Sequence, residues 1–543
     1  MTNLTLPSIV NTVCYYACSL KNHLRPVSIR GSILGNFNLI MQLLNHINDI
    51  IYIVVKIKKM IQVFNNDLKF LIPEIYLGVC ILGLLMFGVL ITKENTYEKQ
   101  LMITKMSILS LFGYLILVLN NPFPTESVVL FGLLYLNSFN LFMKSIIVIA
   151  SIVLLFMSYD YIKNEDVKNY EFTILILLSV LGMILLVCSY DLLSLYLGIE
   201  LQSLAFYILA AFKRNSIAST EAGLKYFILG SLSSGILLLG MVIVYGLTGT
   251  TSFELFYQLD VNTMSTGVII GFHCIAIALF FKLAAAPFHM WAPDVYEGAP
   301  TVITALFAAI SKLPILAIFI QLFNGYLTNF YPYINHIVIL VSLASMFVGA
   351  IGALGQFNIK RLLAYSSILN VGYMLLGLSV GNNQGVQMTV LFALVYMIVS
   401  LNLFSFLLAL RTTDNKLIKN INDLAGLSKS HPLLAFNVSL SFFSLIGVPP
   451  LAGFISKYFL LKAVMDSAWP LLTIVAVITT VIAAVYYLRV VKIMYFDTPT
   501  KPIQLKEINF NLGLVLSVTG FITLFFLFNP NLIMILIEGS LFF

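Results

Sequence analysis

The chain has 543 residues, of which 60% are apolar and only 10% are charged, and its formal net charge is +7. A soluble domain usually carries about 25% charged residues, so this composition excludes an ordinary soluble protein and makes lipid the solvent for most of the chain. The five cysteines include no C-x-x-C pair, which argues against a zinc or iron–sulfur site.

Residues 1–66 differ in composition from the rest of the chain. They are rich in Asn, contain no acidic residue before Asp49 and carry several basic residues, a combination typical of a transit peptide. The stretch 36–64 mixes apolar with charged side chains, which favours a helix in the membrane interface or docked on a partner over a membrane span. We therefore expect residues 1–66 to form an N-terminal extension, interfacial or partner-docked.

A membrane-spanning helix needs about 20 mostly apolar residues. The remainder of the chain contains fourteen such stretches, and their apolarity on all sides argues against amphipathic soluble helices. The sequence therefore predicts an all-α, polytopic membrane protein with about fourteen transmembrane helices. Numbered 1 to 14 in chain order, the predicted helices lie near 71–92, 104–120, 141–160, 171–189, 191–212, 222–246, 266–289, 301–324, 334–355, 361–380, 386–410, 434–464, 468–490 and 510–536.

The Lys and Arg residues of the connecting loops alternate along the chain. Seventeen of them lie in the connections after the odd-numbered helices, whereas the connections after helices 2, 4, 6, 8 and 10 contain none. Lys462, at the end of helix 12, departs from this pattern. Because basic loops stay on the side from which membrane proteins are inserted, the asymmetry predicts that the odd-numbered connections share one face. It also supports the helix count.

Five ionisable side chains inside the predicted spans are singled out, because a Lys or Asp at the bilayer centre costs about 2.5–3.5 kcal/mol on the insertion scale. Such residues are candidates for a functional site, and the alternative is a structural ion pair or a snorkelling side chain. For Lys225 the two weigh about equally, because Glu221 precedes it by one helical turn. The five candidates are Glu200 in helix 5, Lys225 in helix 6, Lys282 in helix 7, Lys312 in helix 8 and Lys457 in helix 12.

Proline interrupts helices 7 and 12 close to two of these lysines. Pro287 follows Lys282, and the Pro449–Pro450 pair precedes Lys457. Proline removes a backbone donor, which a membrane protein tolerates where the backbone lines a wet cavity or packs against protein. Broken helices with ionisable residues in two halves of a chain indicate a transporter built from inverted repeats, and ordinary proline kinking is the alternative.

The two breaks lie five helices apart, so we pair helices 4–8 with helices 9–13 as two inverted repeats. The predicted parts are an N-terminal extension at 1–66, helices 1–3 at 67–165, a first five-helix repeat at 166–325, a second five-helix repeat at 326–495 and a C-terminal helix 14 at 496–543.

Several motifs resemble the antiporter-like subunits of respiratory complex I, the NADH–quinone oxidoreductase. The family signatures are similar to FKLAAAPFHMWAPDVYEGAPT at 281–301, NIKRLLAYSSILNVGYM at 358–374 and GVPPLAGFISK at 447–457. The segments IELQSLAFYILAAF and STEAGLKYFILGSLSSG resemble the subunit 2 family in particular, the N subunit of bacteria. The resemblance covers roughly residues 70–500.

The resemblance implies a role for each candidate. Glu200 matches the family's helix 5 glutamate, which partners the helix 7 lysine, here Lys282. Lys312 takes the connecting position in helix 8, Lys457 the helix 12 position near an exit, and Lys225 the helix 6 position. If Glu200 and Lys282 lie about 7 Å apart at an effective dielectric of 20, they attract by about 2.4 kcal/mol. Separating them would let the lysine pass its proton through water to Lys312 and then Lys457.

The resemblance also implies the setting. NADH, FMN, iron–sulfur clusters and ubiquinone are expected elsewhere in the complex and no cofactor or metal in this chain, in which we find no Gly-rich phosphate loop. The adjacent antiporter-like subunit 4, subunit 4L and membrane lipid are the expected partners, without nucleic acid. We expect the mitochondrial inner membrane, with a bacterial plasma membrane as the alternative.

Other classes of function stay open at this point. One is a free-standing cation/proton antiporter, a class to which these subunits are similar, and purification of the chain alone or in a large assembly would discriminate between the two. A structural membrane spacer is disfavoured because each intramembrane charge costs energy to keep. An enzyme acting within the membrane is disfavoured because the sequence shows no nucleophile–base or metal pairing.

Overall fold

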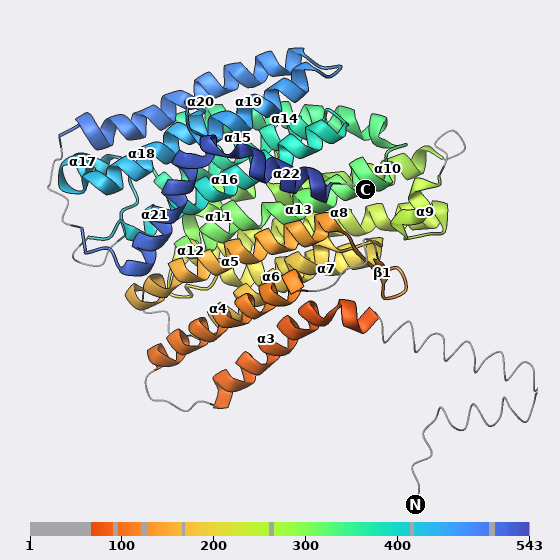
Figure 1. Ribbon diagram of the computed structural model, residues 1–543, viewed down its shortest axis with the longest axis horizontal. Coiled ribbons are helices and arrows are strands. Elements are labelled where there is room, and N and C mark those ends of the chain that lie inside the picture. The colour runs from red at the N-terminus through yellow and green to blue at the C-terminus, as the bar shows by residue number, and fades with distance from the viewer. Residues whose placement is uncertain are drawn as a thin grey trace, which may run out of the picture. The chain divides into compact units, whose positions relative to one another are not determined.

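The computed structural model of the chain describes residues 67–90, 96–120, 127–165, 169–259, 265–412, 417–498 and 505–541. The predicted N-terminal extension at 1–66 lies outside the described residues. The chain divides after Leu71, and the second part, Ile72–Phe543, is a compact unit of its own. In this unit the long helices lie side by side, with α3 and α4 at one edge and α20 at the opposite edge (Figure 1).

Uninterrupted helices account for most of the unit. They are α3 Ile72–Leu90, α4 Thr96–Asn120, α5 Ser138–Asn164, α6 Glu171–Val187, α7 Leu192–Ala210, α8 Ile217–Thr248, α14 Tyr331–Leu354, α15 Ile359–Leu378, α16 Asn383–Ala409 and α20 Leu471–Phe496. Many of their apolar side chains are exposed, and the others pack against neighbouring helices. Shorter elements lie between them: the hairpin of β1 Ser127–Val129 and β2 Leu134–Leu136, and helices α9 Phe253–Tyr257, η4 Asn422–Leu424 and α17 Leu427–Ser430.

Four of the predicted helices are interrupted. Predicted helix 7, at 266–289, corresponds to α10 Thr266–Leu283, which ends before Pro287, and α11 Trp291–Gly298 follows the break. Helix 12 consists of α18 Pro432–Ile446 and α19 Ala452–Met465. Both breaks contain a cis proline, at Ala286–Pro287 and Pro449–Pro450. Helix 8 changes winding within one span, through α12 Thr301–Ala305, the π-helical η2 Leu306–Ile310, α13 Lys312–Phe319 and the π-helical η3 Ile320–Tyr326. Helix 14 comprises α21 Phe510–Phe525, η5 Phe526–Phe528 and α22 Pro530–Ser540.

The predicted all-α architecture and the breaks in helices 7 and 12 are confirmed, with the small hairpin as an addition. Among the described residues twelve helices are long and apolar enough to cross a membrane, and α6 and α18 are shorter apolar helices. Together they account for the fourteen predicted stretches. The prediction of one continuous helix at 510–536 was wrong, because Pro530 starts a new helix and cannot continue the preceding one. Helix α4 begins at Thr96, eight residues earlier than predicted. The prediction from hydropathy missed its first turns because they are polar.

The odd-numbered connections meet at one end of the bundle, here named the Lys-rich face. Glu165, after α5, accepts a hydrogen bond at 2.9 Å from Arg411, after α16, and pairs with Lys213, after α7. Burial raises the pKa of the Glu165 carboxyl. The hydrogen bond from Lys213 and the charges of Lys213 and Arg411 outweigh burial, so this pKa lies below its ordinary value.

The even-numbered connections meet at the other end, named the Lys-poor face. The backbone N–H of Tyr190, after α6, donates to Leu133 O at 3.0 Å in the hairpin after α4. Leu192 N donates to Thr251 O at 3.0 Å, in the connection after α8. The C-terminal helix ends here too, because Ser138 Oγ donates to Ser540 O at 2.9 Å. The alternation of loop charge therefore corresponds to two opposite ends of the bundle.

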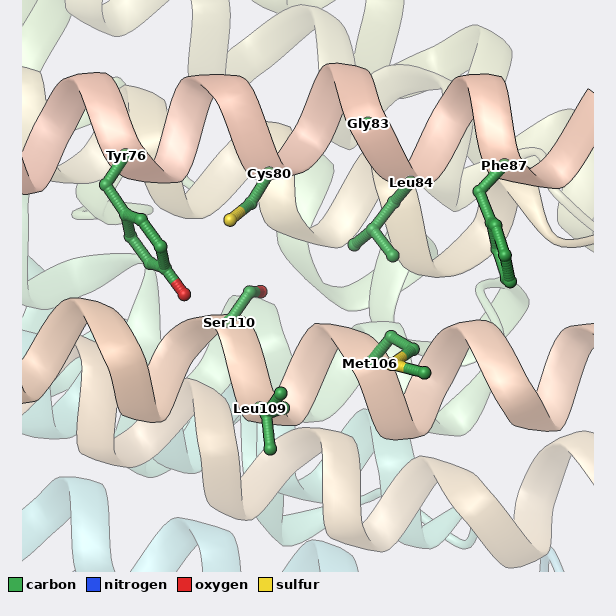
Figure 2. A pocket seen from close by; sticks show the side chains of 8 residues that line it. All are labelled: Tyr76, Cys80, Gly83, Leu84, Phe87, Met106, Leu109 and Ser110. Atoms are coloured by element: carbon green, nitrogen blue, oxygen red, sulfur yellow. The ribbon is translucent and has the colours of Figure 1, made fainter.

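Helices α3 and α4 are separated by a groove of about 300 Å³. Figure 2 shows Tyr76, Leu84 and Phe87 pointing from α3 towards α4, which contributes Met106 and Leu109 among others. The groove is predominantly apolar. By contrast, Gly349 and Gly372 let the backbones of α14 and α15 come into close contact.

Candidate functional site

Lys282 lies in the last turn of α10, directly before the break of helix 7. Its ammonium group donates a hydrogen bond of 3.3 Å to Tyr207 Oη and lies 5.6 Å from the centre of that ring. Tyr207 belongs to α7 and packs edge-on against Tyr226 of α8. The break thus ends α10 at a lysine that contacts the helix carrying Glu200.

Glu200 lies two turns before Tyr207 on the same face of α7. Its carboxylate acts on Lys282 electrostatically, but the two form no direct ion pair. Its Oε1 atom is buried and has no hydrogen-bond partner among the described groups. The two residues therefore interact across a gap, with an unsatisfied acceptor on the glutamate side. Such an acceptor favours a site where water or a proton binds.

Lys312 begins α13, where the π-helical turn η2 returns to α-helix. Only 2% of its surface is exposed. The ammonium group donates to Ser367 O at 3.3 Å and to Tyr396 Oη at 3.5 Å. π-Helical turns frequently occur at functional sites, because they redirect a side chain without ending the helix. Here that turn places a lysine between α15 and α16.

Lys457 lies in α19, after the break of helix 12. The last carbonyl groups of α18 have no partner within their own helix, and Lys457 donates to Leu445 O at 2.6 Å and to Ile446 O at 3.2 Å. Gly447 ends α18 with a positive φ of 93°. A Cβ atom at Gly453 would lie 1.8 Å from Ser444 O, so only glycine permits this approach. Glycine geometry therefore lets Lys457 cap a broken helix inside the protein.

A small cavity lies beside Lys457. It is lined by Lys457, Tyr396 and the polar side chains of Asn370, Ser444 and Ser456. Tyr396 is shared, because its hydroxyl also accepts the hydrogen bond from Lys312. Tyr396 thus contacts Lys312 and lines the cavity beside Lys457, although the two lysines are 145 positions apart in the sequence.

Lys225 differs from these lysines. It forms ion pairs of 2.8 Å with Glu221 in its own helix and with Asp294 in α11, and its side chain is 43% exposed. Arg361 of α15 extends the network to Asp294 and Glu297. The ion pairs of Lys225 and Arg361 together join α8, α11 and α15 near the Lys-rich face. They support the alternative that Lys225 belongs to a structural ion pair.

Two further buried charges were missed by the sequence reasoning. Glu74 in α3 and Lys144 in α5 form an ion pair of 2.5 Å and are 8% and 2% exposed. Both lie inside predicted helices 1 and 3. The signal that identified the other five, a charge within an apolar stretch, was available for them as well. Among the described residues no cluster of three or more His, Cys, Asp or Glu could hold a metal ion.

Comparison with known proteins gives consistent results. The family described as NADH:quinone oxidoreductase/Mrp antiporter, TM matches residues 189–483. NADH-ubiquinone oxidoreductase chain 2 of Marchantia polymorpha is 41% identical over 480 residues, which cover 86% of this chain and 97% of that protein. NADH-quinone oxidoreductase subunit N of Pelagibacter ubique is 40% identical over 469 residues, covering 86% and 98%.

Solved structures share the fold. A chain in the structure of respiratory complex I from Thermus thermophilus with bound aureothin matches with a TM-score of 0.70 and 26% identity, covering 85% of this chain and 98% of that one. A chain of the Mrp complex from Dietzia matches with a TM-score of 0.72 at 20% identity, covering 86% and 96%.

Proposed function

The chain belongs to the NADH:quinone oxidoreductase/Mrp antiporter family, and we propose that it is the proton-translocating membrane-arm subunit 2, or N, of NADH:ubiquinone oxidoreductase. It contributes to that enzyme without a redox centre of its own. NADH, FMN, iron–sulfur clusters and ubiquinone bind elsewhere in the complex. Their chemistry supplies the energy that this subunit uses to move protons.

One observation carries the assignment of the proton path to particular residues. Among the described residues, Lys282, Lys312 and Lys457 form no ion pair, and their ammonium groups have one, two and two hydrogen-bond acceptors. Lys144 and Lys225, by contrast, each bind a carboxylate. A carboxylate partner favours the charged form of a lysine, whereas a buried lysine without one gives up its proton more readily.

The hydrogen-bond count explains how such a lysine changes charge without rearranging its neighbours. An ammonium group has three N–H donors, and a neutral amine has two. Lys457 has two acceptors, the carbonyls of Leu445 and Ile446. Both stay satisfied in either state, so the third position is free to give or take a proton. Lys312 also has two acceptors.

We propose the following order of transfer. Glu200 stabilises the charged form of Lys282 across the gap between them. When their separation increases, Lys282 passes its proton through water to Lys312. Lys312 passes it through the cavity beside Tyr396 to Lys457. Lys225 lies outside this line, and a part for it in proton transfer is a separate proposal.

The remaining assignments rest on the family. We propose that residues 166–325 and 326–495 are the two antiporter-like repeats, that 67–165 supply helices 1–3 and that 496–543 supply helix 14. Antiporter-like subunit 4 and subunit 4L are the proposed neighbours within the membrane arm, and the N-terminal extension 1–66 contacts a partner or the membrane surface. The proposed location is the mitochondrial inner membrane. A bacterial plasma membrane is the alternative, because bacterial relatives are nearly as similar.

The proposal is tested with Glu200→Gln, Lys282→Met and the double variant in assembled complex reconstituted into vesicles. Both changes act on one loading step, so we expect each to reduce proton translocation per assembled complex. The double variant should resemble the more affected single variant, because effects within one step do not add. Normal translocation per complex in both single variants would exclude these residues from the path.

Glu507→Gln provides the matched control. Glu507 is exposed near the Lys-rich face, so the same chemical change there should leave translocation and assembly unchanged. Variants that lower the amount of assembled complex but not its translocation would indicate a structural role instead.

A further inference from the structure

The ion pair between Glu74 and Lys144 shares no hydrogen-bond or ion-pair partner with Lys282, Lys312 or Lys457. It joins α3 to α5, and Tyr114 of α4 donates a weak hydrogen bond of 3.4 Å to the same carboxylate oxygen, Oε1. The other oxygen, Oε2, is buried without a hydrogen-bond partner. The Cys188 thiol, at the end of α6, interacts with Lys144 and is also buried. Four elements thus enclose one carboxylate with a free acceptor.

A polar cavity of about 630 Å³ opens at the Lys-poor face. Its walls come from the connection after α6, from α9, from η3 and the residues after it, from the start of α16 and from Leu541, so it forms a vestibule at this face. The lining residues are Tyr190, Glu254, Tyr257, Gln258, Asn324, Gly325, Tyr326, Thr328, Asn383 and Leu541. A cavity of this size and polarity holds water.

Two buried amides in contact with each other, Gln321 and Asn140, are neighbours along their helices of the vestibule and of the ion pair, respectively. Asn324 lines the vestibule, and Gln321, three residues earlier in η3, is 2% exposed and donates to Asn140 Oδ1. Asn140 belongs to α5 and lies one helical turn before Lys144, on the same face. Segment η3 is π-helical. Irregular backbone at membrane depth is tolerated where it is enclosed by protein or lines a water-filled space.

We propose that Glu74 and Lys144 form a second protonation site, which exchanges protons with the Lys-poor face through the Asn140–Gln321 contact and the vestibule. The transport role of this site rests on the proposed function, whereas its protonation does not. Side-chain amides do not release protons at neutral pH, so Asn140 and Gln321 act by orienting water between the vestibule and Lys144.

The proposed step moves a single proton. Lys144 transfers a proton from Nζ to Glu74, breaking an N–H bond and forming an O–H bond. The resulting amine takes up the proton that arrives by water from the vestibule. The net change is one proton gained by Glu74, and the reverse sequence releases it. Tyr114 and Cys188 are the other titratable groups that face this pair.

The alternative is a permanent ion pair that only holds α3, α4 and α5 together. A buried ion pair often contributes little to stability compared with apolar side chains, yet removing one partner is destabilising. Loss of assembly in Glu74→Gln would therefore not distinguish the two. The test needs a measurement of protonation and a variant that leaves the pair intact.

Infrared difference spectroscopy of the assembled complex provides this measurement. We expect a protonated carboxyl band that Glu74→Gln removes and that shifts when the buffer is changed to D2O. In Gln321→Leu, which leaves both charges in place, deuterium exchange of this band should slow about tenfold or more, because the polar route is interrupted. Gln100→Leu is the matched control, since Gln100 is a buried amide that bonds Thr173 away from the vestibule.

The outcomes separate the possibilities. If Glu74→Gln does not assemble, the band and its exchange are followed in Gln321→Leu and Tyr114→Phe. Absence of any band that responds to these variants between about pH 5 and pH 9 would show that Glu74 stays ionised, and it would overturn the proposal. Exchange that is equally fast in Gln321→Leu and wild type would overturn the route. Normal pumping in both Glu200→Gln and Lys282→Met, with the Glu74 band unchanged, would exclude Glu200 and Lys282 from the proposed path and leave this site standing.

Discussion

Replacement of Lys457 separates proton transfer from structural support. In Lys457→Met the side-chain volume is kept, but the carbonyls of Leu445 and Ile446 lose their donor. A hydrogen bond from a charged donor contributes about 1.5–3 kcal/mol and one from a neutral donor about 0.5–1.5 kcal/mol. Loss of two such bonds therefore destabilises the broken helix by about 3–6 kcal/mol if Lys457 is charged at rest, and by about 1–3 kcal/mol if it is neutral.

Lys457→Gln divides the two effects. The amide group offers two N–H donors with one bond less reach, and it has no basic nitrogen. We expect the amount of assembled complex to rise from Met to Gln towards wild type. Proton transfer through the subunit should fall on the order of 10²-fold or more in both variants, as when a proton-transferring group is removed from an enzyme.

The assay is proton uptake or release per NADH oxidised in vesicles, normalised to assembled complex, with thermal inactivation of the purified complex as the stability measure. A Lys457→Gln complex that translocates protons at the wild-type ratio would refute the reasoning, because Lys457 would then act only as a helix cap. Equal stability of Met and Gln variants would contradict the assigned hydrogen bonds.

Three further predictions concern residues other than Lys282, Lys312 and Lys457. The folded-state pKa of Glu165 lies below its ordinary value, so its contribution to stability is present above about pH 4.5 and is lost as the pH falls through the folded pKa. The melting temperatures of wild type and Glu165→Gln should therefore differ at pH 7 and converge in acid. A difference in melting temperature that is independent of pH would contradict this prediction. Gly453→Ala should lower the amount of assembled complex, because the new Cβ atom would lie 1.8 Å from Ser444 O, at a cost of about 1–3 kcal/mol. Gly513→Ala, at a position with open space around it, should leave assembly unchanged. Equal assembly of the two variants would refute the packing argument. Lys225→Met should lower assembly slightly and leave pumping per complex unchanged, and reduced pumping per complex would restore Lys225 to the proton path.

The positions of the helices, and the face of the bundle on which each connection lies, could be predicted from the amino-acid sequence. Hydropathy is a property of each stretch alone, so fourteen spans could be predicted from local composition. The loop charges assigned those spans to two faces that the structure then displayed. The charge of each candidate and the proline breaks were equally local, so Lys282, Lys312 and Lys457 could be singled out before any contact was known.

Which of these charges form ion pairs could be seen only in the tertiary structure. Glu200 has no direct ion pair with Lys282, whereas Lys225 binds Asp294, 69 residues away. Lys144 binds Glu74 across 70 residues, and the sequence pattern did not reveal this pair. Pairing depends on how helices pack against one another, and uniformly apolar helices carry no periodic pattern that specifies their neighbours. The charged residues can thus be identified from the sequence, but the ion-pair partner of each one depends on how the helices pack.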